Sequence, residues 1–137
     1  MYSHADLIFV GKLLRIENEE SPARVAVLRN LLTIKGEALD EVTLCSDDHQ
    51  ERLGVRVIGE DSQVYFFRKK NSCHVGAFGY KSIIYIKKGT NCIFAQFAYY
   101  GKEYIDKLEP LETFVSKLTG GKSISFPESL KGNTCGE

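Results

Sequence analysis

Two clusters of cysteine, histidine and acidic residues have the side chains that could bind a metal ion or act as catalysts. They comprise Cys45, Asp47, Asp48 and His49, and then Cys73 and His74. Zinc is bound by such ligands, but the chain has no Cys-x-x-Cys pair, and neighbouring residues of a strand point to opposite faces. The segment Ser46–Arg52 is strongly polar and typical of an exposed loop. We therefore expect solvated acids and an exposed histidine there, and no metal site.

A cysteine beside a histidine can also form a nucleophilic thiolate. Cys73 or Cys92 could pair with His74, yet no local signature accompanies them. The adjacent acids Asp47 and Asp48 are better explained as loop charges than as an acid–base pair. The glycines lack the spacing of a phosphate-binding loop. We therefore expect no catalytic residue and no cofactor, and the sequence predicts that the chain is not an enzyme.

The four cysteines are Cys45, Cys73, Cys92 and Cys135. An even number permits two disulfides in three alternative pairings, whereas the simpler interpretation is incidental or buried thiols. Cys135 lies in a polar segment and is a poor candidate for a bridge to the core. The sequence leaves the pairing open.

Aromatic and basic side chains lie close together in two segments, and such residues can bind single-stranded nucleic acid by stacking and charge. The residues that could form this interaction surface are Tyr65, Phe67, Arg68, Lys69, Lys70, Tyr99 and Tyr100. In a strand, however, half of the aromatic side chains must face the core, and Arg68–Lys70 is typical of a solvated turn. The 18 basic and 18 acidic residues cancel, which argues against a nucleic-acid partner.

Short apolar segments separated by turn-forming residues predict the elements that position these groups. Ala5–Ile16 is the central segment; a capping pattern at Ser3 and Asp6 would suit a helix, but the β-branched residues and Gly11 favour a strand with a bend. Strands are expected at Ala5–Ile16, Arg24–Ile34, Glu41–Leu44, Val55–Ile58, Gln63–Arg68, His74–Phe78, Ser82–Lys87 and Cys92–Tyr100.

The apolar spacing changes near the C-terminus to that of one helix face. Apolar residues recur at Leu111, Phe114, Val115 and Leu118, so a helix is expected over about 110–119, begun by Pro110 and ended by Gly120 and Gly121. Many short strands and one terminal helix predict a mainly β fold, a small antiparallel barrel or sandwich with a C-terminal α-helix. We predict the β-barrel, since its closure would protect the strand edges. We expect a single domain over residues 1–121 and a polar, flexible tail over 122–137.

The N-terminal segment resembles netrin-like domains, the OB-type barrels of the tissue inhibitors of metalloproteinases and related bacterial proteins. The resemblance is carried by Tyr2, by Ala5–Leu13 (Ala-Asp-Leu-Ile-Phe-Val-Gly-Lys-Leu), by Lys35–Gly36 and Val42–Leu44, and more loosely by Gly59 and Val64–Phe67. It covers about half of the chain. It implies an OB-type barrel and a non-enzymatic, inhibitor-like module that binds another protein.

Protease-inhibiting members of that family carry a Cys-x-Cys at the mature N-terminus that binds the protease zinc, and no residue of this sequence occupies those positions. Metalloproteinase inhibition is therefore not carried over, and the protein partner stays unknown. The resemblance favours an extracytoplasmic location if a leader has been removed upstream, and otherwise a cytoplasmic one. No apolar run reaches the length of about 18 residues that a membrane span needs. The alternative function is an OB-fold module that binds single-stranded nucleic acid.

Overall fold

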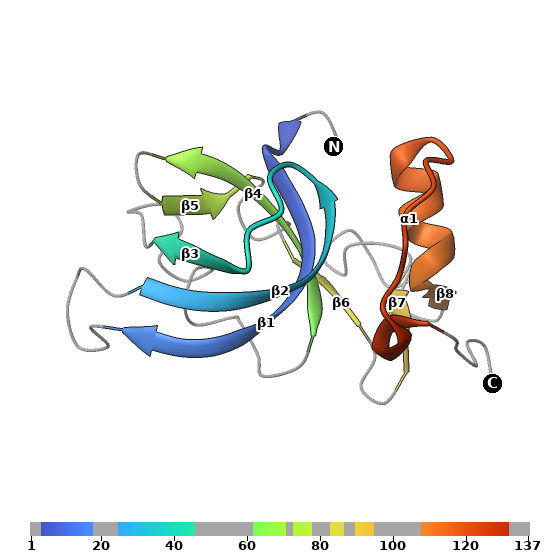
Figure 1. The fold of residues 1–137 in the computed structure, drawn as a ribbon, viewed down its shortest axis with the longest axis horizontal. Coiled ribbons are helices and arrows are strands. Elements are labelled where there is room, and N and C mark those ends of the chain that lie inside the picture. Colours follow the sequence, from blue (N-terminus) through green and yellow to red (C-terminus); the bar gives the residue numbers. More distant parts are fainter. Residues whose placement is uncertain are drawn as a thin grey trace. The chain divides into compact units, whose positions relative to one another are not determined.

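The computed structural model describes residues 4–17, 25–45, 62–70, 73–77, 83–86, 90–94 and 108–131 of the 137-residue chain (Figure 1). The chain divides into two compact units, Met1–Ile83 and Ile84–Glu137. The first unit is built from strands, and the second contains the helix.

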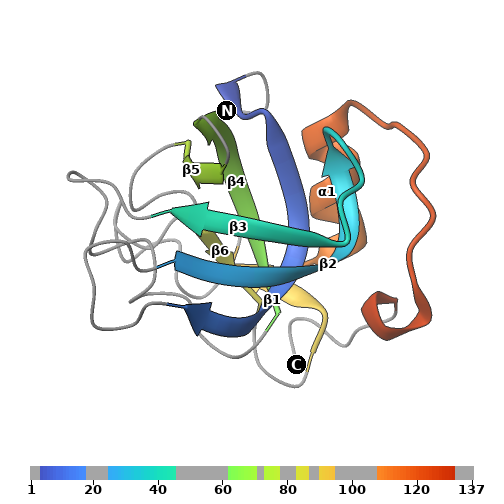
Figure 2. The same cartoon turned by 60° about the vertical axis from the view of Figure 1, so that its left-hand side comes forward.

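Five strands of the first unit form a closed barrel, with β1 at Leu7–Glu17, β2 at Val25–Lys35, β3 at Glu41–Cys45, β4 at Gln63–Lys70 and β5 at Cys73–Gly76. The neighbours β4, β1, β2 and β3 pair antiparallel in that order, which is a Greek key. Strand β5 closes the ring between β4 and β3 (Figures 1 and 2). The predicted small β-barrel with a C-terminal helix is confirmed. Strand β6 (Ile83–Tyr85) adjoins β4 in the same sheet.

One pairing of the ring, β3 with β5, is parallel. Strand directions can alternate all the way around a closed ring only when the number of strands is even. With five strands in the ring, at least one neighbouring pair must run in the same direction. The expected antiparallel barrel is therefore antiparallel except at this junction.

Apolar side chains fill the barrel interior, and three aromatic rings lie at its centre. Phe9, Tyr65 and Phe67 have ring centroids 5.3 to 5.5 Å apart. The remaining members of the cluster are Leu7, Ala26, Leu28, Val42, Leu44 and Ile83. This filling makes the barrel a packed core instead of a container for a ligand.

Leu7–Gly11 of β1 and Gln63–Phe67 of β4 are buried on both faces of the sheet. The residues that alternate with the interior ones, Ile8, Val10, Val64 and Phe66, are each 0% exposed. A strand buried on both faces has a continuous apolar sequence. This burial explains why Ala5–Ile16 shows no clear alternation and resembled a helix as much as a strand.

The second unit contains β7 (Cys92–Phe94), β8 (Leu108–Pro110), α1 (Leu111–Thr119) and the short 3₁₀ helix η5 (Glu128–Leu130). Strands β7 and β8 pair antiparallel, and the Leu111 N–H donates to the Asn91 carbonyl over 2.9 Å. Asn91 Nδ2 also donates to the carbonyls of Ser129 and Lys131. These bonds join Ser129 and Lys131, within the predicted tail, to the β7–β8 region of the same unit.

The predicted helix is confirmed, with small differences at its start. Leu111 and Val115 are buried, and Phe114 and Leu118 are half-buried. Pro110 precedes the first helical residue instead of occupying it. Gly120 adopts a left-handed conformation with φ 73°, where its N–H and that of Gly121 bond carbonyls of the last turn.

The solvated turn predicted at Arg68–Lys70 is wrong. Strand β4 continues to Lys70, because Arg68, Lys69 and Lys70 pair with Val75, His74 and Cys73 of β5. The cross-strand ladder thus outweighs the local preference of charged residues for a turn. The strand expected at Val55–Ile58, and residues 95–100 of the one expected at Cys92–Tyr100, lie outside the described residues.

Candidate functional site at the β3–β5 seam

The predicted interaction surface is divided by the fold. Tyr65 and Phe67 lie in the barrel core at 0% and 1% exposure, so the prediction that these two rings belong to a binding surface is wrong. Their even spacing along β4 turns both toward the interior. The cations Arg68–Lys70 are exposed at the end of the same strand. Tyr99 and Tyr100 lie outside the described residues.

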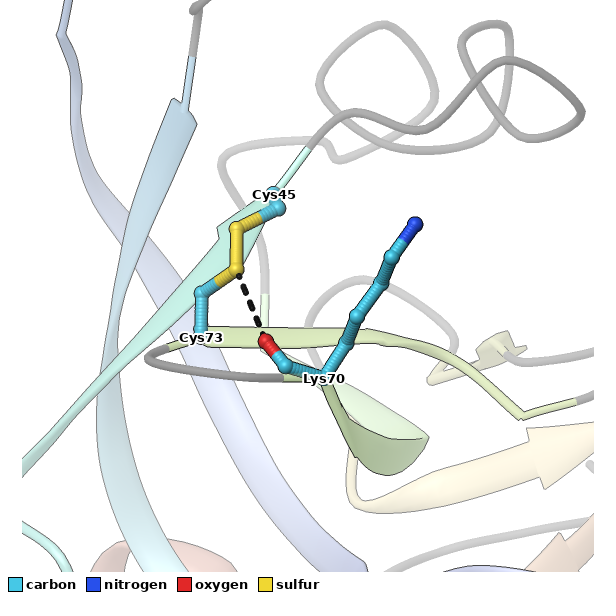
Figure 3. The surroundings of a disulfide bond; sticks show 3 residues. All are labelled: Cys45, Lys70 and Cys73. Carbon is cyan, nitrogen blue, oxygen red and sulfur yellow. Dashed lines mark hydrogen bonds between the residues drawn. A yellow bond between two sulfur atoms is a disulfide. The ribbon is translucent and has the colours of Figure 1, made fainter.

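A disulfide joins Cys45, the last residue of β3, to Cys73, the first residue of β5 (Figure 3). The two Cα atoms are 5.9 Å apart, and the residues are separated by 28 positions in the sequence. Directly beside it, Leu44 of β3 pairs with His74 of β5. These four residues, Leu44, Cys45, Cys73 and His74, are called the β3–β5 seam below.

The disulfide removes the chemistry that thiolates would provide. Cys45 and Cys73 are bonded to each other, and Cys92 is disulfide-bonded as well. A sulfur in a disulfide is neither a zinc ligand nor a nucleophile. The cysteine–histidine nucleophile considered from the sequence is therefore not formed. Asp47, Asp48 and His49 lie outside the described residues, and no group of metal-binding side chains occurs within the described ones.

The backbone carbonyl of Lys70 lies 3.5 Å from Cys73 Sγ (Figure 3). Lys70 and Cys73 are directly opposite each other in the β4–β5 ladder. A disulfide sulfur carries no hydrogen, so this approach is a close contact in the oxidised protein. In a thiol, the same geometry would let S–H donate to the carbonyl.

His74 is buried at the seam, with an exposure of 8%. Its ring lies 6.4 Å from that of Phe67, measured between centroids. Burial lowers the pKa of His74, and the nearby Lys69 lowers it further, while Asp6 and Glu37 act in the opposite direction. The imidazole is therefore neutral at pH 7, and it takes part in core packing.

Asp6 fastens the start of β1 to the end of β4. Its N–H donates to the Phe67 carbonyl over 2.8 Å, and its carboxylate accepts the Lys69 N–H over 2.8 Å. These two hydrogen bonds hold the C-terminal end of β4, with its exposed cations, next to the residue that precedes β1. Asp6 thus has a structural role in closing this end of the barrel.

The outer surface of β1–β3 carries a second group of polar residues, the charged face, defined as Lys12, Arg15, Glu17, Arg29 and Glu41. Arg15 Nε lies 2.8 Å from Glu17 Oε2, and its Nη2 lies 3.6 Å from Glu41 Oε1. Hydrogen bonding to Glu17 is the main reason that the pKa of Arg15 is raised. Lys12 and Arg29 are opposite each other across β1 and β2. This face was not predicted from the sequence, because its members come from three separated segments.

A shallow recess of about 170 Å³ lies beside the connection from β2 to β3. Asn30 Nδ2 donates to the Leu39 carbonyl over 2.8 Å and to Thr33 Oγ1, while Oδ1 has no hydrogen-bond partner. Small-molecule sites usually enclose at least about 300 Å³. The recess is therefore too small for a cofactor, and we assign Asn30 a structural role in this turn.

No protein-family model, no curated protein and no solved structure matches the chain. The resemblance to netrin-like domains thus stands on the residues quoted for it. None of the helices in the described part of the chain has the length and apolarity needed to span a membrane.

Proposed function

We propose that this chain is an OB-type barrel of the netrin-like kind, acting outside the cytoplasm as a non-enzymatic module that binds another protein. The observation that carries the proposal is the five-stranded Greek-key barrel joined by a disulfide between Cys45 and Cys73. A closed barrel of this kind is the architecture of OB folds. Disulfides persist mainly in oxidising compartments, which supports an extracytoplasmic location.

The filled interior supports binding on the outside of the barrel. The central rings Phe9, Tyr65 and Phe67 leave the core occupied by the protein's own side chains. OB folds generally bind their ligands across the surface of strands 2 and 3. In this chain, Arg29 and Glu41 of the charged face lie on β2 and β3, and its other three residues lie on the neighbouring β1.

The charged face suits a protein partner. It combines three cations with two carboxylates, whereas nucleic-acid surfaces are dominated by positive charge. Lys12 stands opposite Arg29, and like charges facing each other across strands are unfavourable. Glu41 of β3 stands opposite Arg29 on its other side and offsets part of this repulsion, and an acidic group of a partner would relieve the remainder. We therefore propose that the partner presents carboxylates to Lys12 and Arg29.

The location is tested by the intact mass of the protein from its own source, with free thiols blocked before any reductant is added. The proposal expects bridged cysteines and therefore no labelling of Cys45 or Cys73. Four labelled thiols would place the protein in a reducing compartment and contradict an extracytoplasmic role.

The binding surface is tested by affinity capture from the extracytoplasmic fraction, followed by a direct measurement of Kd with the captured protein. Lys12→Glu with Arg29→Glu should weaken binding by at least about tenfold through charge repulsion. Lys122→Glu is the matched control, since Lys122 is also an exposed lysine but lies in the second unit. Equal affinities for both variants would exclude the charged face.

Binding of single-stranded nucleic acid is the second candidate, favoured by the three exposed cations Arg68–Lys70 on an OB-type barrel. Tyr65 and Phe67 are unable to stack on bases while they lie in the core. Fluorescence polarisation with a labelled oligonucleotide decides this alternative. Binding at low salt that weakens steeply with added salt would favour it, and the absence of binding at low salt would remove it.

A further inference from the structure

We infer that the Cys45–Cys73 disulfide is a redox switch that keeps the barrel closed, so that its reduction opens the barrel between β3 and β5 while the other four pairings persist. The inference rests on how unevenly the strand pairings are distributed around the ring. It goes beyond the proposed function, because it does not depend on the identity of any partner.

Among the described residues, the β3–β5 pairing has fewer residue pairs than any other pairing in the barrel. Within the described residues it consists of one pair, Leu44 with His74. The β1–β2 ladder has nine residue pairs, β1–β4 and β2–β3 have five each, and β4–β5 has four. A ring opens first where the fewest hydrogen bonds must break, and the disulfide lies at that position.

Each side of the seam has support of its own. Strand β3 stays paired to β2 from Glu41 to Cys45, and Val42 and Leu44 belong to the core cluster. Strand β5 stays paired to β4 from Cys73 to Gly76. Opening therefore leaves a continuous sheet in the order β3, β2, β1, β4 and β5, and full unfolding is not required.

The Lys70 carbonyl provides a hydrogen-bond acceptor for the reduced state. It lies 3.5 Å from Cys73 Sγ and belongs to β4, the strand that keeps β5 in place. After reduction the Cys73 thiol can donate to this carbonyl. The reduced thiol is thus held on the β4–β5 side, away from Cys45 on β3.

Both cysteines of the seam are half-buried, so a reductant can approach them. The reaction is thiol–disulfide exchange with a dithiol, either a small molecule or a protein. One dithiol sulfur attacks the Cys45–Cys73 bond and forms a mixed disulfide, and the second sulfur then displaces the protein. Two electrons and two protons pass from the dithiol to the protein, giving two protein thiols and an oxidised dithiol.

Opening would change what the barrel presents to solvent. His74 is 8% exposed and Leu44 is 3% exposed in the closed form. Closure of a barrel hides the strand edges, and opening creates two new edges, on β3 and β5. In the closed barrel the facing edges of β3 and β5 are paired with each other. Reduction therefore exposes these two strand edges to solvent.

The test measures amide hydrogen exchange, residue by residue, in the full chain carrying Cys45→Ser and Cys73→Ser with Cys92 unchanged. The matched control is the wild-type protein in enough urea to reach the same global stability. In the variant, amides of β3 and β5 at the seam should exchange at least about tenfold faster than in the control, because local opening adds to global unfolding. Amides in the β1–β4 ladder should exchange equally in both.

Equal exchange in variant and control at the seam would overturn the inference, because the disulfide would then act on global stability alone. An unfolded variant would overturn it as well, since the other pairings are required to persist. A second measurement follows the reduction of the wild-type Cys45–Cys73 bond by dithiothreitol, with alkylation and peptide mapping. The rate should be insensitive to low urea; a rate that rises with global unfolding would mean that the bond is reduced only in the unfolded chain, and would contradict a switch that acts in the folded barrel.

Discussion

Gly11 and Arg29 approach each other so closely across β1 and β2 that only glycine fits at position 11. A Cβ added to Gly11 would lie 2.7 Å from the Arg29 carbonyl oxygen, and it would also meet the ring of Phe9. The register of β1 against β2 shifts between Val10 and Gly11. The glycine expected to bend this strand therefore allows close contact between two backbones.

Replacement of Gly11 by Ala should lower the free energy of unfolding by about 1–3 kcal/mol, because the core and the neighbouring strand must move to accept the methyl group. Urea denaturation measures this change. Lys12→Ala at the adjacent exposed position should stay within about 0.5 kcal/mol of wild type. If both variants lost a similar amount of unfolding free energy, the close contact between Gly11 and the Arg29 carbonyl would have no specific role in stability.

Three residues of Ala5–Leu13, the segment that carries most of the netrin-like resemblance, have a packing role in this barrel. Asp6 bonds the Lys69 N–H, Phe9 lies in the central aromatic cluster, and Gly11 lies against Arg29. These roles explain why the opening segment could predict a barrel. They do not identify a partner, because none of these three residues is on the charged face, to which the same segment contributes only Lys12.

Sequence patterns predicted most strands and the helix because these depend on local periodicity and turn residues. They could not predict that Cys45 bonds Cys73, since closure of the ring, and not sequence spacing, brings the end of β3 to the start of β5. The aromatic residues of β4 were misassigned for a related reason. Alternation gives two faces, but only the barrel determines that Tyr65 and Phe67 face inward.

Loss of the Cys45–Cys73 bond should lower the free energy of unfolding by about 3–4 kcal/mol, the chain-entropy value for a loop of 28 residues. Denaturation of the variant with Cys45→Ser and Cys73→Ser, compared with the oxidised wild type, measures this difference. Denaturation of that variant in its oxidised and reduced forms measures how much the disulfide of Cys92 contributes to the free energy of unfolding. A loss below about 1 kcal/mol would mean that the bond hardly constrains the unfolded chain.

His74 should make the protein less stable in mild acid. Its pKa is lowered in the folded state from 6.5 by burial and by Lys69, so the unfolded chain binds a proton more readily. The stabilisation is complete above the unfolded pKa of about 6.5 and is lost as the pH falls toward the lower folded pKa. Thermal denaturation between about pH 7.5 and pH 5 should show this decline.

The matched variant for this pH effect is His74→Gln, which keeps a polar side chain but does not titrate. Its stability should decline less than that of wild type over the same pH range, whatever its stability at pH 7.5. An identical decline in both proteins would assign the effect to other groups.

Asn30 should stabilise the connection between β2 and β3 through its side-chain amide. Asn30→Ala removes the donor to the Leu39 carbonyl and to Thr33 Oγ1, so we expect a loss of about 1–2 kcal/mol. The loss is limited because the unpartnered Oδ1 disappears together with the donor. Asp40→Ala is the control, since Asn30 bonds the backbone carbonyl of Asp40 and not its exposed carboxylate. If the two variants lose equal stability in urea denaturation, the amide contributes nothing specific to this turn.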